Sequence, residues 1–360
     1  MVTRVFTVDP LVPRGDLLRA AAEILRNGGL VAFPTETVYG LGADATSAAA
    51  VSRIFEAKGR PQDNPLIVHV HSYDAVPPLV AELPARAEVL MYRFWPGPLT
   101  LVLKKSRLVT ENVSPGLATV GIRMPDHAVA LNLIRLSGVP VAAPSANASG
   151  RPSPTSASHV LSDLGGKIEA VVDGGPCGIG VESTVLDLTV EPPAILRPGG
   201  TTREAVEEVL GDVVLDATVV NAGGPKSPGT KYRHYAPSAR VFLVDPGRVP
   251  AGGLLRKFAA EFAARGHRVG VLASSEVLAE GGTSRKPTGE WDDQGTAWLD
   301  AGSERDLDEV AARLFDNLRR FDDLGADVVL AQVFPETGMG LAIMNRLLKA
   351  AEGRVLRSGS

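Results

Sequence analysis

Two cations, Lys58 and Arg60, stand two residues apart in the segment KGRPQDNPL (58–66), where an apparent helix gives way to a turn with two prolines. Alone, the pair is typical of a solvated helix end, because Lys and Arg favour the last turn and proline often follows it. Other side chains of the kind that bind phosphate and carboxylate groups are Arg123, Arg197, Thr35, Thr119, Ser145, Ser153 and Ser183. Together they predict a site for an anionic substrate.

These side chains stand where short apolar strands run into loops. The strand at 30–33 breaks at Pro34 into a polar loop that begins with Thr35, and the alternating segment LATVGIRMP places Thr119 and Arg123 on one face. Three further segments repeat the arrangement: VPVAAPSANASG with Ser145 and Asn147, GVESTVLDL with Ser183, and PAILRPGG with Arg197. Because open α/β sheets collect ligands at strand ends, we expect the residues to share one crevice.

The order of elements predicts two α/β domains. Residues 1–205 mix short strands with helices, which predicts a mixed, twisted sheet flanked by helices. Residues 206–237 are dense in Gly, Pro and Ser and predict a linker. Residues 238–352 alternate strand with helix, which predicts a smaller, parallel, Rossmann-like domain, and 353–360 are expected to be a tail.

Composition limits the classes of function. The net charge of −4 gives no overall basic field, so strong direct binding of nucleic acid is not expected. Cys177 is the only cysteine, which excludes an intramolecular disulfide framework. There is neither the apolar core of a signal peptide at the N-terminus nor an apolar run of about eighteen residues. These features predict a soluble, cytoplasmic protein without a membrane segment.

Several common catalytic motifs are absent from the sequence. Residues 224–229 have the glycine spacing of a phosphate-binding loop, but Thr230 and Lys231 follow in the reversed order. No GxGxxG follows a strand, and GxSxG is missing. His69 and His71 share a face of PLIVHVH, but without further His or Cys nearby they do not predict a metal site.

Seven segments carry a family resemblance over nearly the whole chain. They are PTETVYGLG, KGRPQDNPLIVHV, WPGPLTLVL, TVGIRMPDH, APSANASGRPSPT, GVESTVLDL and LRPG. Their order and spacing resemble the YrdC-like domain, and SPGTKYRHYAP with the second domain resembles the long, two-domain threonylcarbamoyl-AMP synthases. The resemblance implies a YrdC-like sheet in the first domain and a nucleotidyltransferase reaction.

The resemblance also implies roles for individual residues. Lys58, Arg60, Ser145 and Asn147 correspond to the family's signature at the nucleotide site. ATP contacts would include Lys58, Arg60, Asn64, Thr119, Ser145, Ser153, Arg197 and Tyr235. Threonine contacts would be Thr35, His69, Arg123, Ser183 and the backbone around Ala143. No general base is assigned.

The implied reaction joins L-threonine, bicarbonate or carbon dioxide, and ATP to give threonylcarbamoyl-adenylate and pyrophosphate. Mg²⁺ would accompany the ATP, and a downstream threonylcarbamoyl transferase would carry the product to N6 of the tRNA adenosine next to the anticodon. The rival hypotheses are a non-enzymatic RNA-binding module and a carbamoyl transferase of the hydrogenase-maturation type. The latter family adds acylphosphatase and zinc-finger segments that are not seen here. The linker is either a lid over the crevice or a passive tether.

Overall fold

The computed structural model describes residues 1–216, 234–280 and 289–358, which fall into two compact units. Among the described residues, the first unit contains 1–149 and 153–216, and the second contains 150–152, 234–280 and 289–358. The first strands are β1 Arg4–Thr7, β2 Val31–Phe33, β3 Gly40–Asp44, β4 Ile67–His69, β5 Leu99–Lys104 and β6 Thr119–Arg123. They are followed by β7 Val141–Ala142, β8 Ala170–Asp173, β9 Thr184–Asp187, β10 Ala194–Arg197 and β11 Val214–Leu215.

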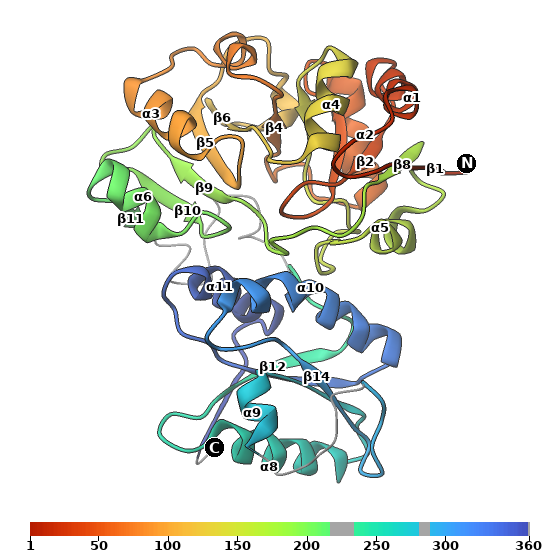
Figure 1. The fold of residues 1–360 in the computed structure, drawn as a ribbon, viewed down its shortest axis with the longest axis vertical. Helices are drawn as coiled ribbons and strands as arrows, with labels where there is room; N and C mark the ends of the chain where they lie inside the picture. Colours follow the sequence, from red (N-terminus) through yellow and green to blue (C-terminus); the bar gives the residue numbers. More distant parts are fainter. Residues whose placement is uncertain (217–233, 281–288, 359–360) are drawn as a thin grey trace. The chain divides into compact units, whose positions relative to one another are not determined.

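One sheet runs through the first unit in the order β1-β8-β2-β3-β7-β4-β6-β5-β9-β10-β11. Its pairings are mixed, since β4 is parallel to β6 and antiparallel to β7. The helices are α1 Gly15–Arg26, α2 Ala48–Lys58, α3 Ala85–Phe94, α4 Ala128–Ser137, α5 Ala157–Leu164 and α6 Arg203–Leu210, with 3₁₀ turns at Tyr73–Ala75, Pro77–Leu79 and Glu111–Val113. The predicted mixed sheet flanked by helices is confirmed (Figure 1).

The sheet is buried on both faces. In β2, Val31 and Phe33 belong to one apolar cluster, which includes residues of α1 and α4, whereas Ala32 belongs to another that includes residues of α2, α3 and α5. Successive side chains of a strand point to opposite faces, so this division places helices on both sides. The sheet is therefore a rigid support for the loops that leave its strand ends.

The second unit has an all-parallel sheet in the order β14-β13-β15-β12-β16. Its elements are β12 Arg240–Asp245, α8 Ala251–Ala263, β13 Val269–Ala273, α9 Ser275–Ala279, β14 Thr296–Asp300, α10 Leu307–Leu324, β15 Val328–Gln332, α11 Met339–Ala350 and β16 Val355–Arg357. The smaller parallel α/β domain predicted from the sequence is confirmed (Figure 1).

The observed units differ from the predicted boundaries at two places. Helix α6 runs from Arg203 into the expected linker and strand β11 lies within it, yet both belong to the first unit, where β11 pairs with β10. Residues 355–357 lie in the expected tail, yet they form β16 and pair with β12. The rest of the predicted linker falls mainly on residues 217–233, outside the described residues. Within the described ranges, no helix has the length and apolar character needed to span a membrane.

Candidate functional site

Lys58 lies at the end of α2, where the chain turns sharply. Ser47 caps the start of this helix, and Gly59 ends it in the left-handed conformation with φ 61°. The Lys58 side chain is only 4% exposed, and its Nζ donates to the main-chain carbonyls of Ser145 and Asn147. Ser145 Oγ in turn donates to Asn147 Oδ1 at 2.5 Å. The structure thus brings together three of the four signature residues.

Arg60, the fourth signature residue, folds back on its own turn. Its Nε and Nη2 donate to the carbonyls of Asn64 and Pro65 at 3.4 and 3.2 Å. Asn64 is buried, and its Oδ1 accepts no hydrogen bond within the described part of the chain. A buried amide oxygen without a donor is uncommon in folded proteins, which marks this turn as a candidate ligand contact.

Arg123 ends β6 and lies beside His69 of β4, because these residues face each other in the parallel register. Arg123 is 4% exposed and donates from Nε to Gly97 O at 3.1 Å and from Nη1 to Thr37 Oγ1 at 3.0 Å. Its Nη2 stands 2.6 Å from Glu36 Oε1. The guanidinium is therefore held in a fixed orientation by three groups from two loops, the one after β2 and the one before β5.

The loop after β2 is tied to the glycine-rich segment before Ser183. Thr35 Oγ1 donates to Val38 O at 2.7 Å and lies 2.8 Å from Thr37 Oγ1. The carbonyls of Glu36 and Thr37 accept hydrogen bonds from the backbone amides of residues 179 and 180. This pairing joins the predicted Thr35 contact to the loop that leads into β9.

The imidazole ring of His69 is uncharged at neutral pH. Burial, assisted by the positive charge of Arg123, lowers the pKa of its imidazole to about 3. Its Nδ1 has no hydrogen-bond partner among the described residues. A neutral imidazole beside a guanidinium offers one donor and one acceptor, which suits a polar ligand better than a second cation would.

Ser183 and Arg197 contact each other directly. Arg197 donates from Nε and Nη2 to Ser183 O at 3.1 and 2.9 Å, and from Nη2 to Ser183 Oγ at 3.2 Å. Ser183 Oγ also lies 2.8 Å from Thr100 Oγ1. The residue expected to bind threonine and the residue expected to bind ATP thus meet at the paired ends of β9 and β10.

The other predicted residues of the first unit take different environments. Ser153 is fully buried, and its Oγ donates to Glu182 Oε1 at 2.5 Å. Thr119 begins β6 half-buried, opposite Lys104 of β5. Ala143 is buried, and its amide donates to Ile67 O at 2.8 Å. Ala143 immediately precedes Pro144 and Ser145, so the chain connects the Arg123 strands to the Lys58 turn.

Tyr235 belongs to the second unit rather than to the group just described. It is 5% exposed, has φ 61°, and stacks on Phe315 with ring centroids 5.4 Å apart. The guanidinium carbon of Arg346 lies 5.5 Å from the centre of the same ring. The predicted contact between Tyr235 and ATP stays a prediction.

The sequence interpretation missed four residues of this site. Glu36 and Thr37 contact Arg123, Glu182 holds Ser153, and Thr100 holds Ser183. Glu36 and Thr37 lie in the quoted segment PTETVYGLG, where a polar triplet after a strand was the available signal. Among the described residues, no group of three or more His, Cys, Asp and Glu is arranged to hold a metal.

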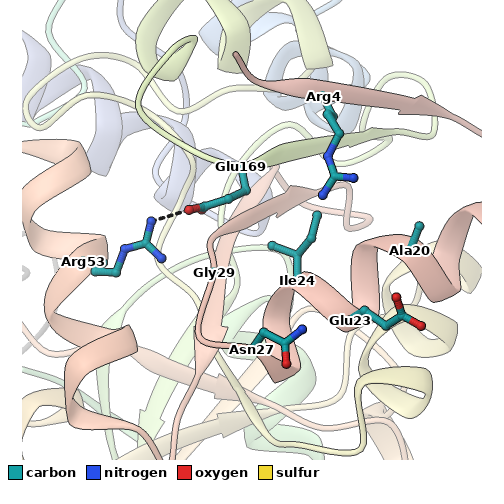
Figure 2. A pocket seen from close by; sticks show the side chains of 8 residues that line it. All are labelled: Arg4, Ala20, Glu23, Ile24, Asn27, Gly29, Arg53 and Glu169. Atoms are coloured by element: carbon teal, nitrogen blue, oxygen red, sulfur yellow. Dashed lines mark hydrogen bonds and ion pairs between the residues drawn. The ribbon is translucent and has the colours of Figure 1, made fainter. Parts of the chain in front are cut away.

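A separate surface pocket lies between α1, α2 and the strands β1 and β8 (Figure 2). It is lined by Arg4, Ala20, Glu23, Ile24, Asn27, Gly29, Arg53 and Glu169. Arg53 forms an ion pair with Glu169, and Glu169 Oε2 accepts from Leu30 N at 2.8 Å. None of the predicted site residues lines this pocket, and its charges are balanced.

Two family profiles together match most of the chain. The profile described as "Telomere recombination" matches residues 23–199, and the one described as "Threonylcarbamoyl-AMP synthase, C-terminal domain" matches 201–352. The threonylcarbamoyl-AMP synthase of Pyrococcus abyssi is 49% identical over 94% of this chain and 95% of its own length. That of Bacillus subtilis is 48% identical over 97% of each.

A solved structure has the same fold over the whole length. The crystal structure of P. abyssi Sua5 complexed with L-threonine is 47% identical, has a TM-score of 0.90, and is covered over 99% of this chain and 100% of that one. Sequence identity close to one half over both units shows relationship by sequence and not only a shared fold. This chain belongs to the threonylcarbamoyl-AMP synthase family.

Proposed function

We propose that the protein converts L-threonine, bicarbonate or carbon dioxide, and ATP into threonylcarbamoyl-adenylate and pyrophosphate. The observation that carries this proposal is the pair of neighbouring polar clusters in the first unit. One contains Lys58, Ser145 and Asn147, and the other contains His69 and Arg123. Val141 of β7 pairs with His69, and the chain continues from it through Ala143 and Pro144 to Ser145.

The two clusters suit the two substrates. A planar guanidinium with fixed orientation binds a carboxylate through paired hydrogen bonds, so the Arg123 cluster takes the amino acid. The Lys58 turn, with Arg60 and Asn64 close behind it, takes the phosphates of ATP. Ser183, just before β9, and Arg197, the last residue of β10, contact each other, and we assign Ser183 to threonine and Arg197 to ATP.

The chemistry then depends on positioning. A carbamate formed on the threonine amine attacks the α-phosphate, and pyrophosphate leaves. Holding the carbamate oxygen close to phosphorus converts an encounter into an intramolecular step, and fixed cations stabilise the charge that develops on the phosphates. Lys58 orients Ser145 and Asn147 through their carbonyls, while Arg60 supplies the second positive charge of the signature turn.

Mg²⁺ is proposed as a companion of ATP, not as a resident of a protein-built site. Mg²⁺ keeps several waters and is usually bound by substrate phosphates with one or two carboxylates. The described residues provide no cluster of three or more metal-binding side chains. We therefore assign no protein ligand to the ion, which would neutralise part of the phosphate charge.

The product is a mixed anhydride, so water must be kept away until it is transferred. We assign that task to the linker, as a lid over bound ATP, and the next step to a downstream threonylcarbamoyl transferase acting on tRNA. The buried ring of Tyr235 supports the proposal of an ordered linker end, since a plain tether needs no stacked aromatic side chain.

Pyrophosphate release tests the reaction. It is expected only when L-threonine, bicarbonate and ATP are all present, and mass spectrometry should find the carbon of labelled bicarbonate in an adduct of threonine and AMP. Omitting each substrate in turn provides the controls. Binding of tRNA without any pyrophosphate release would contradict the proposal and favour the non-enzymatic RNA-binding module.

A further inference from the structure

Glu36 is a buried carboxylate with an incomplete set of partners. Its side chain is 13% exposed, and Oε1 lies 2.6 Å from Arg123 Nη2. Despite this short separation, the contact lacks the alignment of a hydrogen bond, and neither carboxylate oxygen has a hydrogen-bond donor within the described ranges. Buried polar atoms are nearly always hydrogen-bonded, so these two oxygens point to a donor that comes from a ligand.

Arg123 is incompletely satisfied in the same place. A guanidinium has five N–H groups, and this one donates from Nε to Gly97 O and from Nη1 to Thr37 Oγ1. Its Nη2, like Glu36 Oε1, has no hydrogen-bond partner among the residues that the structure describes. Arg123 and Glu36 therefore form an ion pair that leaves Glu36 Oε2 without a hydrogen-bond donor among the described residues.

His69 is a third residue with an atom that lacks a hydrogen-bond partner, next to this pair. Its ring is 4% exposed, and Nδ1 has no partner in the described part of the chain. The lowered pKa keeps the ring neutral, so it adds no charge to the Glu36–Arg123 pair. The local set is one guanidinium, one carboxylate and one neutral imidazole, all from the strand ends of a rigid sheet.

An α-amino acid is complementary to this set. Its carboxylate and its ammonium are separated by a single carbon atom and carry opposite charges, as Arg123 and Glu36 do. We propose that Glu36 binds the α-ammonium of threonine while Arg123 binds the α-carboxylate. This inference rests on the proposed function, and it adds a specificity-determining residue for the amine that becomes the carbamate.

The role follows from the cost of an unpaired buried group. A ligand without an ammonium leaves the Glu36 carboxylate without a donor, and a site built around a buried polar group rejects such an analogue strongly. Glu36 therefore selects amino acids over the corresponding acids in which hydrogen replaces the amine. It also fixes the amine nitrogen relative to Arg123, so that the carbamate forms in one orientation.

Binding of three ligands can distinguish direct recognition of the ammonium by Glu36 from a role in which Glu36 only neutralises the charge of Arg123. L-Threonine has both charged groups, (R)-3-hydroxybutyrate lacks the amine, and L-threoninol lacks the carboxylate. Calorimetric titration of each into the full chain and into Glu36→Gln measures the contribution of the carboxylate. We expect Glu36→Gln to weaken threonine and threoninol by roughly ten- to a hundred-fold, with 3-hydroxybutyrate unchanged or tighter.

Glu169→Gln is the matched control. It removes a carboxylate that is also ion-paired to an arginine in the same unit, in a pocket that shares no residue with this site (Figure 2). It should leave all three affinities unchanged. Weakening of threonine and 3-hydroxybutyrate with threoninol unchanged would show that Glu36 acts only by holding Arg123, and no weakening of any ligand would show that Glu36 contacts neither charged group. Failure of the wild-type protein to bind threonine would instead contradict the proposed function.

Discussion

His69 and Arg123 face each other across the parallel strands β4 and β6, with both side chains 4% exposed. Burial and the neighbouring guanidinium lower the pKa of the imidazole to about 3, whereas the unfolded chain has the ordinary value of 6.5. Between pH 6.5 and about pH 3, His69 is therefore protonated in the unfolded state but not in the folded state. Titration of His69 therefore does not change the free energy of unfolding above about pH 6.5, and it lowers that free energy progressively as the pH falls from 6.5 toward 3.

The variant His69→Gln should remove this linkage. Between pH 6 and pH 4, the wild-type protein should lose up to about 1.4 kcal/mol more unfolding free energy per pH unit than the variant, the limit for one proton. Urea titrations of both proteins at several pH values measure the difference, and all other titrating groups cancel in it. Equal slopes for the two proteins would mean that His69 is protonated in the folded state.

Lys58 and Arg60 should respond differently to truncation. Lys58→Ala removes a buried ammonium from the carbonyls of Ser145 and Asn147, so we expect a loss of about 1–3 kcal/mol of stability as well as of activity. Arg60→Ala removes a half-buried side chain that donates to two main-chain carbonyls of its own turn, and it should reduce activity with a smaller loss of stability than Lys58→Ala.

Both variants should slow adenylate formation by roughly ten- to a hundred-fold, because each removes a charge-assisted contact to phosphate. Urea denaturation and pyrophosphate release measure the two effects separately. Wild-type turnover in both variants would remove these residues from the nucleotide site. A stability loss in Arg60→Ala as large as that in Lys58→Ala would show that the two cations share one structural role.

The strand ends that carry the site were predictable because their signals are local. Proline after residues 30–33 and alternation over 119–123 place Thr35 and Arg123 at strand ends, where the structure has them. The partners of these residues were not predictable in the same way. Thr37 reaches Arg123 across 86 residues of sequence, and periodicity contains no information on such contacts.

The same limit explains the differences in the second unit. Strand β16 has three residues, which is too short for an alternating pattern, and only its pairing with β12 shows that it is a strand. Tyr235 lies in a segment with the composition of a loop, yet Phe315, 80 positions further on by the sequence numbering, covers its ring. Composition describes a segment's own preference and not the surface on which it packs.

Tyr235 should be important for the stability of the second unit. Its ring stacks on Phe315 and lies near the guanidinium of the fully buried Arg346, so Tyr235→Ala should cost about 3–5 kcal/mol, as for other large-to-small changes at buried aromatic positions. Tyr235→Phe keeps the stack and should cost much less. Hydrogen exchange should show reduced protection of α10 and α11 in the alanine variant. If the two variants were equally stable, the stacked ring would contribute nothing.

Gly199 lies where the end of β10 passes the start of β9. A Cβ at this position would stand 2.3 Å from Glu182 O and from the carbonyl carbon of Ser183, and 2.4 Å from Thr184 N. All three are backbone atoms that no side-chain rotation can move. Gly199→Ala must therefore separate the two segments and shift Ser183 away from Arg197.

We expect Gly199→Ala to lower the melting temperature and to abolish most pyrophosphate release, with a stability loss of at least about 1–3 kcal/mol, the usual cost of overpacking. Gly178→Ala is the control, because nothing lies within 4 Å of its added Cβ and its φ is not in the left-handed region. It should retain wild-type stability and activity. If Gly199→Ala also behaved as wild type, β9 and β10 would not need to approach so closely, and the Ser183–Arg197 contact would not depend on that approach.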